Sequence, residues 1–311
     1  MIFTSLASGS SGNCSFVAAE HSRILIDCGL SAKRIDESLK AIGFSADSLD
    51  AIFLTHEHSD HIKGLKRLMS AYHIPVYAST ATLGRLADAA RDEFFRFAGS
   101  DLMHAVSADQ LVQVGDFSVL PFQISHDAAG PLAYRIEVEQ SLAGQSQAMQ
   151  PQLGQFSLRQ PQAEQSYAEQ SHAEDTEPAL RRHVSVAVMT DTGFFDDAMR
   201  DHLLNLDILL LEANHDRGML SNGPYPMALK RRIMSRQGHL SNNAAGQLLA
   251  EIINPRLCHV FLGHLSKENN TPELALATVR REIAERLSER AAVELPLSVA
   301  PYDSMSEVIR L

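Results

Sequence analysis

The sequence is short of cysteines, and the few it has are widely spaced. Only Cys14, Cys28 and Cys258 occur among its 311 residues. No two of them have the C-x-x-C spacing of a structural zinc site, which excludes a site of that kind. Three separated thiols fit a reduced state, so we expect them to pack in the interior of a cytoplasmic protein.

Long apolar runs and basic residues are also scarce. No stretch approaches the roughly 18 consecutive apolar residues that a transmembrane helix requires. The first residues have neither the basic segment nor the apolar core of a secretory signal, so we expect no membrane association. The 27 basic and 38 acidic residues give a net charge of −11, which argues against wrapping of nucleic acid by a basic surface. A local basic groove beside metal ions stays compatible with this charge, because the ions would dominate such a site.

The densest group of metal-ligand side chains is the segment 55–61, Thr-His-Glu-His-Ser-Asp-His, directly after an apolar run. His56 and His58 alternate with other residues, so an extended chain sends both imidazoles to one side. Asp60 and His61 follow where the chain turns into a helical pattern. Imidazole and carboxylate groups are ligands for divalent zinc, manganese and iron. Two such groups side by side suit two metal ions, so the sequence predicts a metallohydrolase.

Short strand-like runs and amphipathic helical patterns alternate along the chain in two successive groups. This order indicates two packed sheets with helices on both outer faces, an α+β fold arranged as a four-layer αββα sandwich. Thr271 is placed as the N-cap of the last long helix and Pro272 as its first residue. The expected strands are 2–6, 14–18, 23–27, 51–54, 75–78, 113–114, 117–123, 133–138, 184–189, 207–212 and 259–263; the expected helices are 33–42, 82–90, 196–204, 242–253 and 272–288, with a loop or short helix over 214–237.

Residues 140–183 interrupt this pattern. Between Gln140 and Gln170 roughly every third residue is glutamine, and aliphatic periodicity is almost absent. Such a composition buries too little apolar area to offset the entropy of ordering it. Because the segment lies between two strand-like runs, we expect a flexible insertion in a hairpin loop of a single domain that spans 1–311. A tether that binds a partner is the alternative.

Further ligand residues follow later strand-like runs. His126, Asp191 and His264 each come directly after an apolar run, and Gly193 permits a sharp exit beside Asp191. A lone His or Asp at a strand end is more often structural. The repeated placement, together with the cluster at 55–61, predicts that all three are metal ligands.

The order of these residues, H-x-H-x-D-H and then separate His, Asp and His, resembles that of the metallo-β-lactamase superfamily. The stretch 26–29, Ile-Asp-Cys-Gly, resembles its first motif, in which a strand-end acid supports the site. The resemblance covers nearly the whole chain outside the glutamine-rich insertion, which departs from the compact form usual in the group. It is sharpened toward the YycJ/WalJ group by the stretches 8–13, 55–61, 211–216, 238–242 and 264–270.

Members of the YycJ/WalJ group are described as metal-dependent exonucleases that act on DNA 5′ ends. The cyclic phosphodiesterases of phosphonate metabolism are related proteins with the same pattern of metal ligands. The resemblance implies two divalent metal ions, zinc or manganese with iron also suitable, and the following assignment. One ion would be bound by His56, His58 and His126, the other by Asp60, His61 and His264, and Asp191 would bridge both.

Two cations about 3.5–4 Å apart would clamp a phosphodiester oxygen and hold a bridging water as the nucleophile. The leaving alkoxide also needs a proton. We predict that His239, at the start of a helix, donates it, with His215 as the rival. A purely structural role for His239 is the alternative. Asp60 is counted with these catalytic residues as well as with the ligands.

The predicted substrate contacts come from three places. The Gly/Ser run 8–13 could form a backbone nest for phosphate, or a plain tight turn. The cationic run 230–232 could contact phosphates, or could be a solvated helix face. Tyr225, between two prolines, could stack on a terminal base. The substrate contacts that we predict are Ser10, Asn13, Lys230, Arg231, Arg232 and Asn269.

Three functions compete for this sequence. A phosphodiesterase, foremost a 5′-exonuclease on DNA ends, is favoured by the cationic run and the candidate phosphate nest. A small-molecule hydrolase of the same superfamily, acting on a cyclic phosphodiester, thioester or lactone, is the alternative. A metal-stabilised regulatory protein that binds partners through its insertion is disfavoured, because structural metal sites seldom keep open positions.

Overall fold

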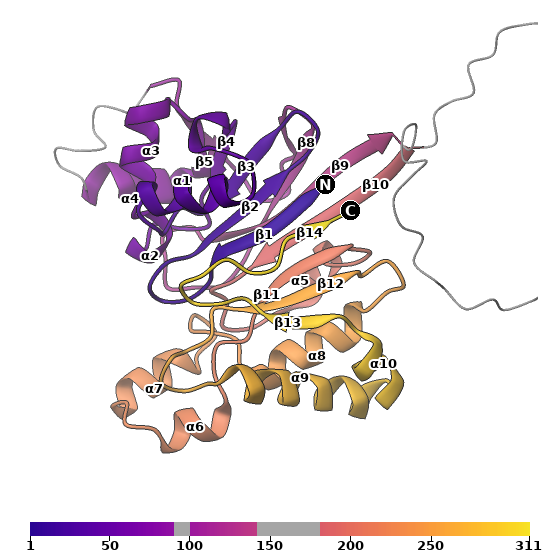
Figure 1. Cartoon of the computed structure of the whole chain (residues 1–311). Coiled ribbons are helices and arrows are strands. Elements are labelled where there is room, and N and C mark those ends of the chain that lie inside the picture. Colours follow the sequence, from indigo (N-terminus) through magenta and orange to yellow (C-terminus); the bar gives the residue numbers. More distant parts are fainter. Residues whose placement is uncertain (90–99, 142–180) are drawn as a thin grey trace, which may run out of the picture. The chain divides into compact units, whose positions relative to one another are not determined.

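Two seven-stranded sheets form the framework of the computed structural model (Figure 1). The chain divides into two units, Met1–Val138 with Val184–Leu311, and Glu139–His183. The second unit consists mostly of residues outside the described part of the chain, and the first contains every predicted site residue. The structure describes residues 1–89, 100–141 and 181–311.

The first sheet has the strand order β14-β1-β2-β3-β4-β5-β6. Strands β1 to β3 are antiparallel and β14 pairs with β1, whereas β3 to β6 run parallel. Parallel strands end at the same edge, so the residues that follow them gather there. The strands are β1 (Ile2–Ala7), β2 (Cys14–Ala18), β3 (Arg23–Ile26), β4 (Ala51–Phe53), β5 (Val76–Ser79), β6 (Met103–Val106) and β14 (Ile309–Arg310).

The second sheet has the order β13-β12-β11-β10-β9-β8-β7. Strands β7 to β9 are antiparallel, and β10 to β13 run parallel, which again brings several strand ends to one edge. The strands are β7 (Val112–Val114), β8 (Phe117–Gln123), β9 (Leu132–Ser141), β10 (Arg181–Met189), β11 (Ile208–Glu212), β12 (His259–Gly263) and β13 (Leu297–Val299).

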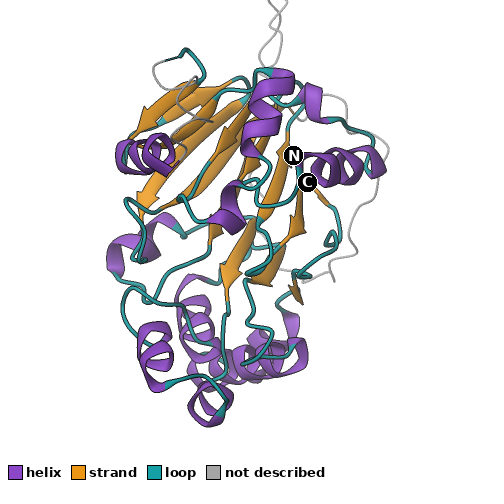
Figure 2. Ribbon diagram, turned by 90° about the vertical axis from the view of Figure 1, so that its left-hand side faces the viewer, coloured by secondary structure: helices purple, strands orange, loops and turns teal. Residues whose placement is uncertain are grey.

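Apolar side chains fill the space between the sheets and beneath the helices. Between the sheets, the rings of Phe3 and Phe261 lie 5.7 Å apart and those of Phe53 and Tyr134 5.4 Å apart. A second cluster lies under α1, α3 and α4, and a third under α5, α8, α9 and α10. The helices therefore cover both outer faces, as Figure 2 also shows, which confirms the predicted αββα sandwich. They are α1 (Ala32–Ala41), α2 (Ser59–Ile62), α3 (Leu65–Tyr72), α4 (Thr80–Ala89), α5 (Asp197–His202), α6 (Arg217–Asn222), α7 (Met227–Ile233), α8 (Asn242–Ile252), α9 (Pro272–Arg286) and α10 (Glu289–Glu294), with a 3₁₀ turn at Ala46–Ser48.

Helix α9 begins as predicted, because the Thr271 side chain accepts a hydrogen bond from the Leu274 amide and Pro272 is the first residue. The predicted helix 82–90 begins earlier, at Thr80, and residue 90 lies outside the described residues. The segment 214–237 contains two short helices, α6 and α7. Strands β6, β13 and β14 were not predicted, because runs this short show too little alternation and depend on their neighbours for pairing.

The expected insertion, 140–183, lies outside the described residues except at its two ends. There β9 continues to Ser141 and β10 begins at Arg181, so both strands reach further than their apolar pattern indicates. Backbone pairing needs no apolar side chains, which explains the difference. In the described ranges, no helix is long and apolar enough to cross a membrane.

Candidate metal centre and the cavities beside it

The predicted ligands lie where strands of both sheets end. Strand β4 leads into the segment 56–58 and then into the short helix α2, which carries Asp60 and His61. The other three ligands belong to the second sheet and follow β8, β10 and β12: His126, Asp191 and His264.

Three strand-end residues have left-handed backbone conformations. Asp27 after β3, Asp191 after β10 and His264 after β12 have φ values of 61°, 58° and 54°. Non-glycine residues seldom adopt this conformation, and it costs free energy that the surrounding fold must offset. The shared geometry turns the chain sharply at each strand end and keeps these side chains buried within the site.

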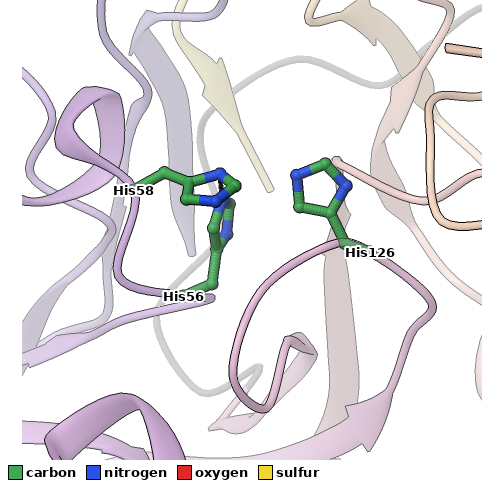
Figure 3. A group of neighbouring side chains, drawn as sticks. All are labelled: His56, His58 and His126. Atoms are coloured by element: carbon green, nitrogen blue, oxygen red, sulfur yellow. Dashed lines mark hydrogen bonds between the residues drawn. The ribbon is translucent and has the colours of Figure 1, made fainter. Parts of the chain in front are cut away.

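His56, His58 and His126 form the first group of candidate ligands, and Figure 3 shows their imidazoles facing a common space. Ring nitrogens of the three lie within 4.8 Å of one another. His56 Nε2 is 3.0 Å from His58 Nδ1, and the rings of His56 and His126 are 5.0 Å apart. Residues more than sixty positions apart in sequence therefore converge on one space.

Asp60, His61 and His264 form a second group with atoms within the same 4.8 Å limit. Asp191 lies between the groups, because its Oδ2 is 3.3 Å from His61 Nε2 and its Oδ1 is 3.9 Å from His126 Nε2. The structure thus brings all seven predicted ligands together, with Asp191 between the two groups.

The charges of this cluster fit cations. Asp191 Oδ2 and His264 Nε2 are buried without a hydrogen-bond partner, which is costly unless an ion satisfies them. Burial alone would lower the pKa of His61, but Asp27 and Asp191 beside it raise this pKa to about 9. Burial and the neighbouring imidazoles hold the pKa of His56 well below its usual value. Imidazoles that give up any extra ring proton when a metal binds, together with buried carboxylates, are a suitable donor set for divalent metal ions.

Asp27 holds part of this cluster in place. Its carboxylate accepts hydrogen bonds from the Thr55 amide at 2.8 Å and the Thr55 hydroxyl at 2.9 Å. It also lies 2.8 Å from His61 Nδ1, which fixes the ring and leaves Nε2 toward Asp191. Such a carboxylate behind a metal-binding imidazole orients the ring and raises its basicity. The supporting role expected for the 26–29 motif is compatible with these contacts.

Glu212, at the end of β11, is a site residue to which the sequence analysis assigned no role. It is fully buried, and its Oε1 lies 2.8 Å from His239 Nδ1 and 3.0 Å from His264 Nδ1. Its Oε2 accepts hydrogen bonds from the amides of Thr192 and Leu240. The available signal was an acid that ends an apolar strand run, the same signal that identified Asp191.

The two candidate proton donors differ in their surroundings. His239 is partly exposed and held by Glu212 through Nδ1. His215 is buried, its Nδ1 has no hydrogen-bond partner, and burial lowers its pKa to about 4. His239 thus combines access to solvent with a contact to a buried carboxylate.

Three cavities adjoin the cluster. The first, the Tyr225 cavity, has a volume of about 360 Å³ and includes Ser10, Arg232, His239, His264 and Lys267 in its lining. The Lys63 cavity, of about 560 Å³, is lined by Ser10, Ser11, Ser59, Asp60, Ile62, Lys63 and Lys66. The Arg217 cavity, of about 350 Å³, is lined by Gly193, His215, Arg217, Ser221, Met234, His239, Ser241 and Ala244.

The predicted substrate contacts are only partly placed at these cavities. Ser10 lines two of them, and Arg232 lines one while paired with Asp127. Lys230 is buried and its ammonium donates to the Ser221 carbonyl at 2.7 Å. Arg231 is exposed. Lys230, Arg231 and Asn269 are not among the residues that line these three cavities.

Asn13 lies against the ligands themselves. Its Nδ2 is 3.0 Å from His61 Nε2, and its Oδ1 accepts from the Gly9 amide at 2.8 Å. The Gly12 amide donates to the Gly9 carbonyl, so the run 8–13 contains a tight turn, the plainer of the two predicted alternatives. Asn13 therefore links this turn to the candidate ligand His61.

Comparison with known proteins identifies the family. A model described as "Metallo-beta-lactamase superfamily" matches residues 7–140. The chain is 31% identical over 284 residues to Exodeoxyribonuclease YycJ of Bacillus anthracis. The aligned region covers 91% of this chain and 89% of the relative. The chain belongs to the metallo-β-lactamase superfamily. A further relative, Exodeoxyribonuclease WalJ of Streptococcus pneumoniae serotype 2, is 32% identical over 91% of this chain and 88% of its own length, which confirms the resemblance to the YycJ/WalJ group.

Solved structures with low sequence identity to this chain have the same fold. YhfI from Bacillus subtilis superposes with a TM-score of 0.59 at 16% identity and covers 98% of each chain. Zn²⁺-bound PqqB from Methylobacterium extorquens gives 0.60 at 15% identity over the full length of both chains. As a superfamily member this chain is a metal-dependent hydrolase, and its His and Asp clusters fit divalent metal ions.

Proposed function

We propose that this protein is a metal-dependent exodeoxyribonuclease that degrades DNA from 5′ ends. The observation that carries this proposal is the similarity, over 91% of the chain, to relatives named exodeoxyribonucleases. That similarity spans a site whose clustered His and Asp side chains fit divalent metal ions. DNA ends in the cytoplasm are therefore the proposed substrate, and the free thiols of the described residues suit that compartment.

The metal centre that we propose contains two divalent ions, zinc or manganese, with iron also accepted by such donors. When bound, they would supply a water of lowered pKa and neutralise the charge that builds on the phosphate. Asp27 and Glu212 then act behind the ligands, each holding one imidazole in a fixed orientation. One ion would be held by His56, His58 and His126, the other by Asp60, His61 and His264, with Asp191 shared.

His239 is the proposed proton donor for the leaving oxygen. Its Nδ1 is engaged by Glu212, and among the described residues no hydrogen-bond partner contacts its Nε2. The ring lines the Tyr225 cavity together with His264, so a proton on Nε2 is available beside the reacting phosphodiester. The buried Glu212 carboxylate fixes the orientation of the ring through Nδ1. His215 takes this role only if His239 proves to be a ligand.

The proposed path of the DNA strand follows two of the cavities. The Tyr225 cavity offers an aromatic ring for base stacking and the cations of Arg232 and Lys267. The Lys63 cavity offers a second lysine, Lys66, and shares Ser10 with the first. Asp60, a proposed ligand, lies in the wall of the second cavity, so phosphates on both sides of the centre would meet positive charge. These local cations explain how an acidic protein could hold DNA.

Degradation of 3′-labelled linear duplex, in parallel with a cyclic phosphodiester, tests this function. The assay compares zinc, manganese and iron after removal of bound metal, with covalently closed circular DNA as the matched control without ends. We expect progressive loss of nucleotides from linear DNA, no cleavage of the circle, and complete loss of activity with chelator. Rapid cleavage of the cyclic phosphodiester with intact duplex would instead establish the small-molecule alternative.

A further inference from the structure

We propose that the Arg217 cavity binds the 5′-terminal phosphate of the DNA strand that is being degraded. The cavity adjoins the metal cluster but contains none of the seven predicted metal ligands. Its polar lining offers a guanidinium, two hydroxyls and two imidazoles, which are groups that bind phosphate. This inference rests on the proposed function and specifies how the same site recognises the 5′ end.

An unsatisfied buried group points to a ligand in this place. His215 is 2% exposed, and its Nδ1 has no hydrogen-bond partner. A buried nitrogen in this state costs free energy unless a ligand or water satisfies it. His215 is one of the residues that line the Arg217 cavity. Because burial lowers the pKa of His215, the ring is neutral near pH 7 and can donate one N–H without carrying a charge.

The positive potential of the cavity has three sources. Arg217 is exposed and has no acidic partner among the residues described. Helix α8, of 11 residues, begins at the wall of the cavity, where Ser241 is its N-cap, and a helix N-terminus favours anions. The buried ammonium of Lys230 donates to the carbonyl of Ser221, another lining residue. The nearby acid, Asp216, accepts the Met219 amide and so caps α6.

The Arg217 cavity lies next to the Tyr225 cavity, in which the phosphodiester would react. His239 lines both the Arg217 cavity and the Tyr225 cavity, which contains His264. A phosphate monoester in the first would therefore lie one imidazole away from a phosphodiester in the second. A terminal phosphate carries more negative charge than an internal diester and presents more oxygens to donors. Recognition of that group would select strand ends over internal sites.

The experiment compares single-stranded oligonucleotides of one sequence with a 5′-phosphate, a 5′-hydroxyl or a 3′-phosphate. Initial rates are measured on the metal-loaded protein, and dissociation constants are measured by fluorescence anisotropy on the metal-free protein. We expect the 5′-phosphate to improve both by about 10-fold, equivalent to ~1.4 kcal/mol. Arg217→Ala should abolish the preference and Arg217→Lys should keep part of it. Arg281→Ala, which removes an exposed arginine of α9, is the matched control and should leave the preference intact.

The outcomes separate this inference from the proposed function. Degradation of DNA with no preference for a 5′-phosphate, or with a preference that survives Arg217→Ala, would overturn the phosphate site alone. An equal preference for a 3′-phosphate would overturn its assignment to the 5′ end. If no metal supports DNA degradation but metal-free binding still favours the 5′-phosphate through Arg217, the exonuclease function fails and the site stands.

Discussion

Glu212 contacts four groups with one buried carboxylate: two imidazoles through Oε1 and two backbone amides through Oε2. A buried carboxylate is stable only when its charge is compensated, and here His239 and His264 supply the compensation. The same residue thus joins the proposed proton donor to a proposed ligand. Its removal should affect protonation and metal binding to different extents, which kinetics can separate.

The first prediction concerns this pair. Glu212→Gln should lower turnover by about 10²-fold, and His239→Ala by about 10²–10⁴-fold, the range of general acid catalysis. Because Glu212 acts partly through His239 and partly through His264, the loss in the double variant should be smaller than the two single losses combined, which a double-mutant cycle measures. Both defects should shrink with a phenolate leaving group, which needs no proton. Fully additive losses, or loss of bound metal in His239→Ala, would contradict this assignment.

Whether a site residue could be predicted from the sequence depended on its residue type. Candidate ligands such as His126 and Asp191, which the structure brings into one cluster, carried a signal in the sequence because each is an imidazole or carboxylate directly after an apolar run. Glu212 has the same signal, but only the fold shows which strand ends share an edge. Lys230 was assigned to the substrate from its charge, whereas its side chain is buried toward Ser221. The direction of a side chain on a short helix depends on tertiary packing.

Among the elements, the α8–α9 pair shows how closely the outer layer is packed. Gly246 lies within α8, where a β-carbon would stand 2.6 Å from Glu282 Cβ and 3.1 Å from Val279 Cα. Two helices can approach this closely only where one lacks a side chain. By contrast, a β-carbon at Gly84 in α4 would meet nothing within 4 Å.

The second prediction uses this contrast. Gly246→Ala should destabilise the protein, because overpacking costs about 1–3 kcal/mol and outweighs the ~1 kcal/mol gained in helix propensity. Gly84→Ala is the matched control and should stabilise by about 0.5–1 kcal/mol. Urea unfolding gives both values as shifts of the midpoint at constant slope. Stabilisation by both substitutions would show that α8 and α9 move apart without cost.

The third prediction concerns the hairpin that carries the glutamine-rich segment. Replacing 142–180 with a short Gly/Ser turn keeps β9 to Ser141 and β10 from Arg181. We expect the melting temperature to change by only a few degrees and DNA degradation to persist, because the composition of the segment offers little apolar burial. A version cut back to Val138 and Val184 removes the outer strand residues and should be less stable. A large loss of stability and activity in the first version would make the segment integral to the fold.

At the scale of the whole molecule, the metal cluster joins the two sheets. His56, His58 and His61 follow a strand of the first sheet, whereas His126, Asp191 and His264 follow strands of the second. The αββα layering was predictable because two groups of strands alternate with helices. The way in which one sheet packs on the other was not predictable, because it depends on contacts between residues far apart in sequence, such as Phe53 and Tyr134.

The fourth prediction follows from this junction. Chelation of bound metal should lower the melting temperature by about 5–10 °C, because a ligand at 100 times its Kd contributes ~2.7 kcal/mol and each kcal/mol shifts a chain of this size by about 2–4 °C. Differential scanning calorimetry with and without chelator measures the shift. Asp191→Ala should abolish most of the response to chelator. An identical melting temperature in both conditions would show that the cluster contributes no stability through metal.

The ends of the chain lie side by side in the first sheet, where β1 pairs with β14 and the Met1 amino group donates to the Leu311 carbonyl at 2.8 Å. The first and last residues of the sequence are therefore adjacent, and joining them would not require either sheet to rearrange. A short linker could join these ends, and new termini could be opened within 142–180 without breaking a described element. Such a circular permutant would carry His264 ahead of His56 in sequence and still assemble the same site in space.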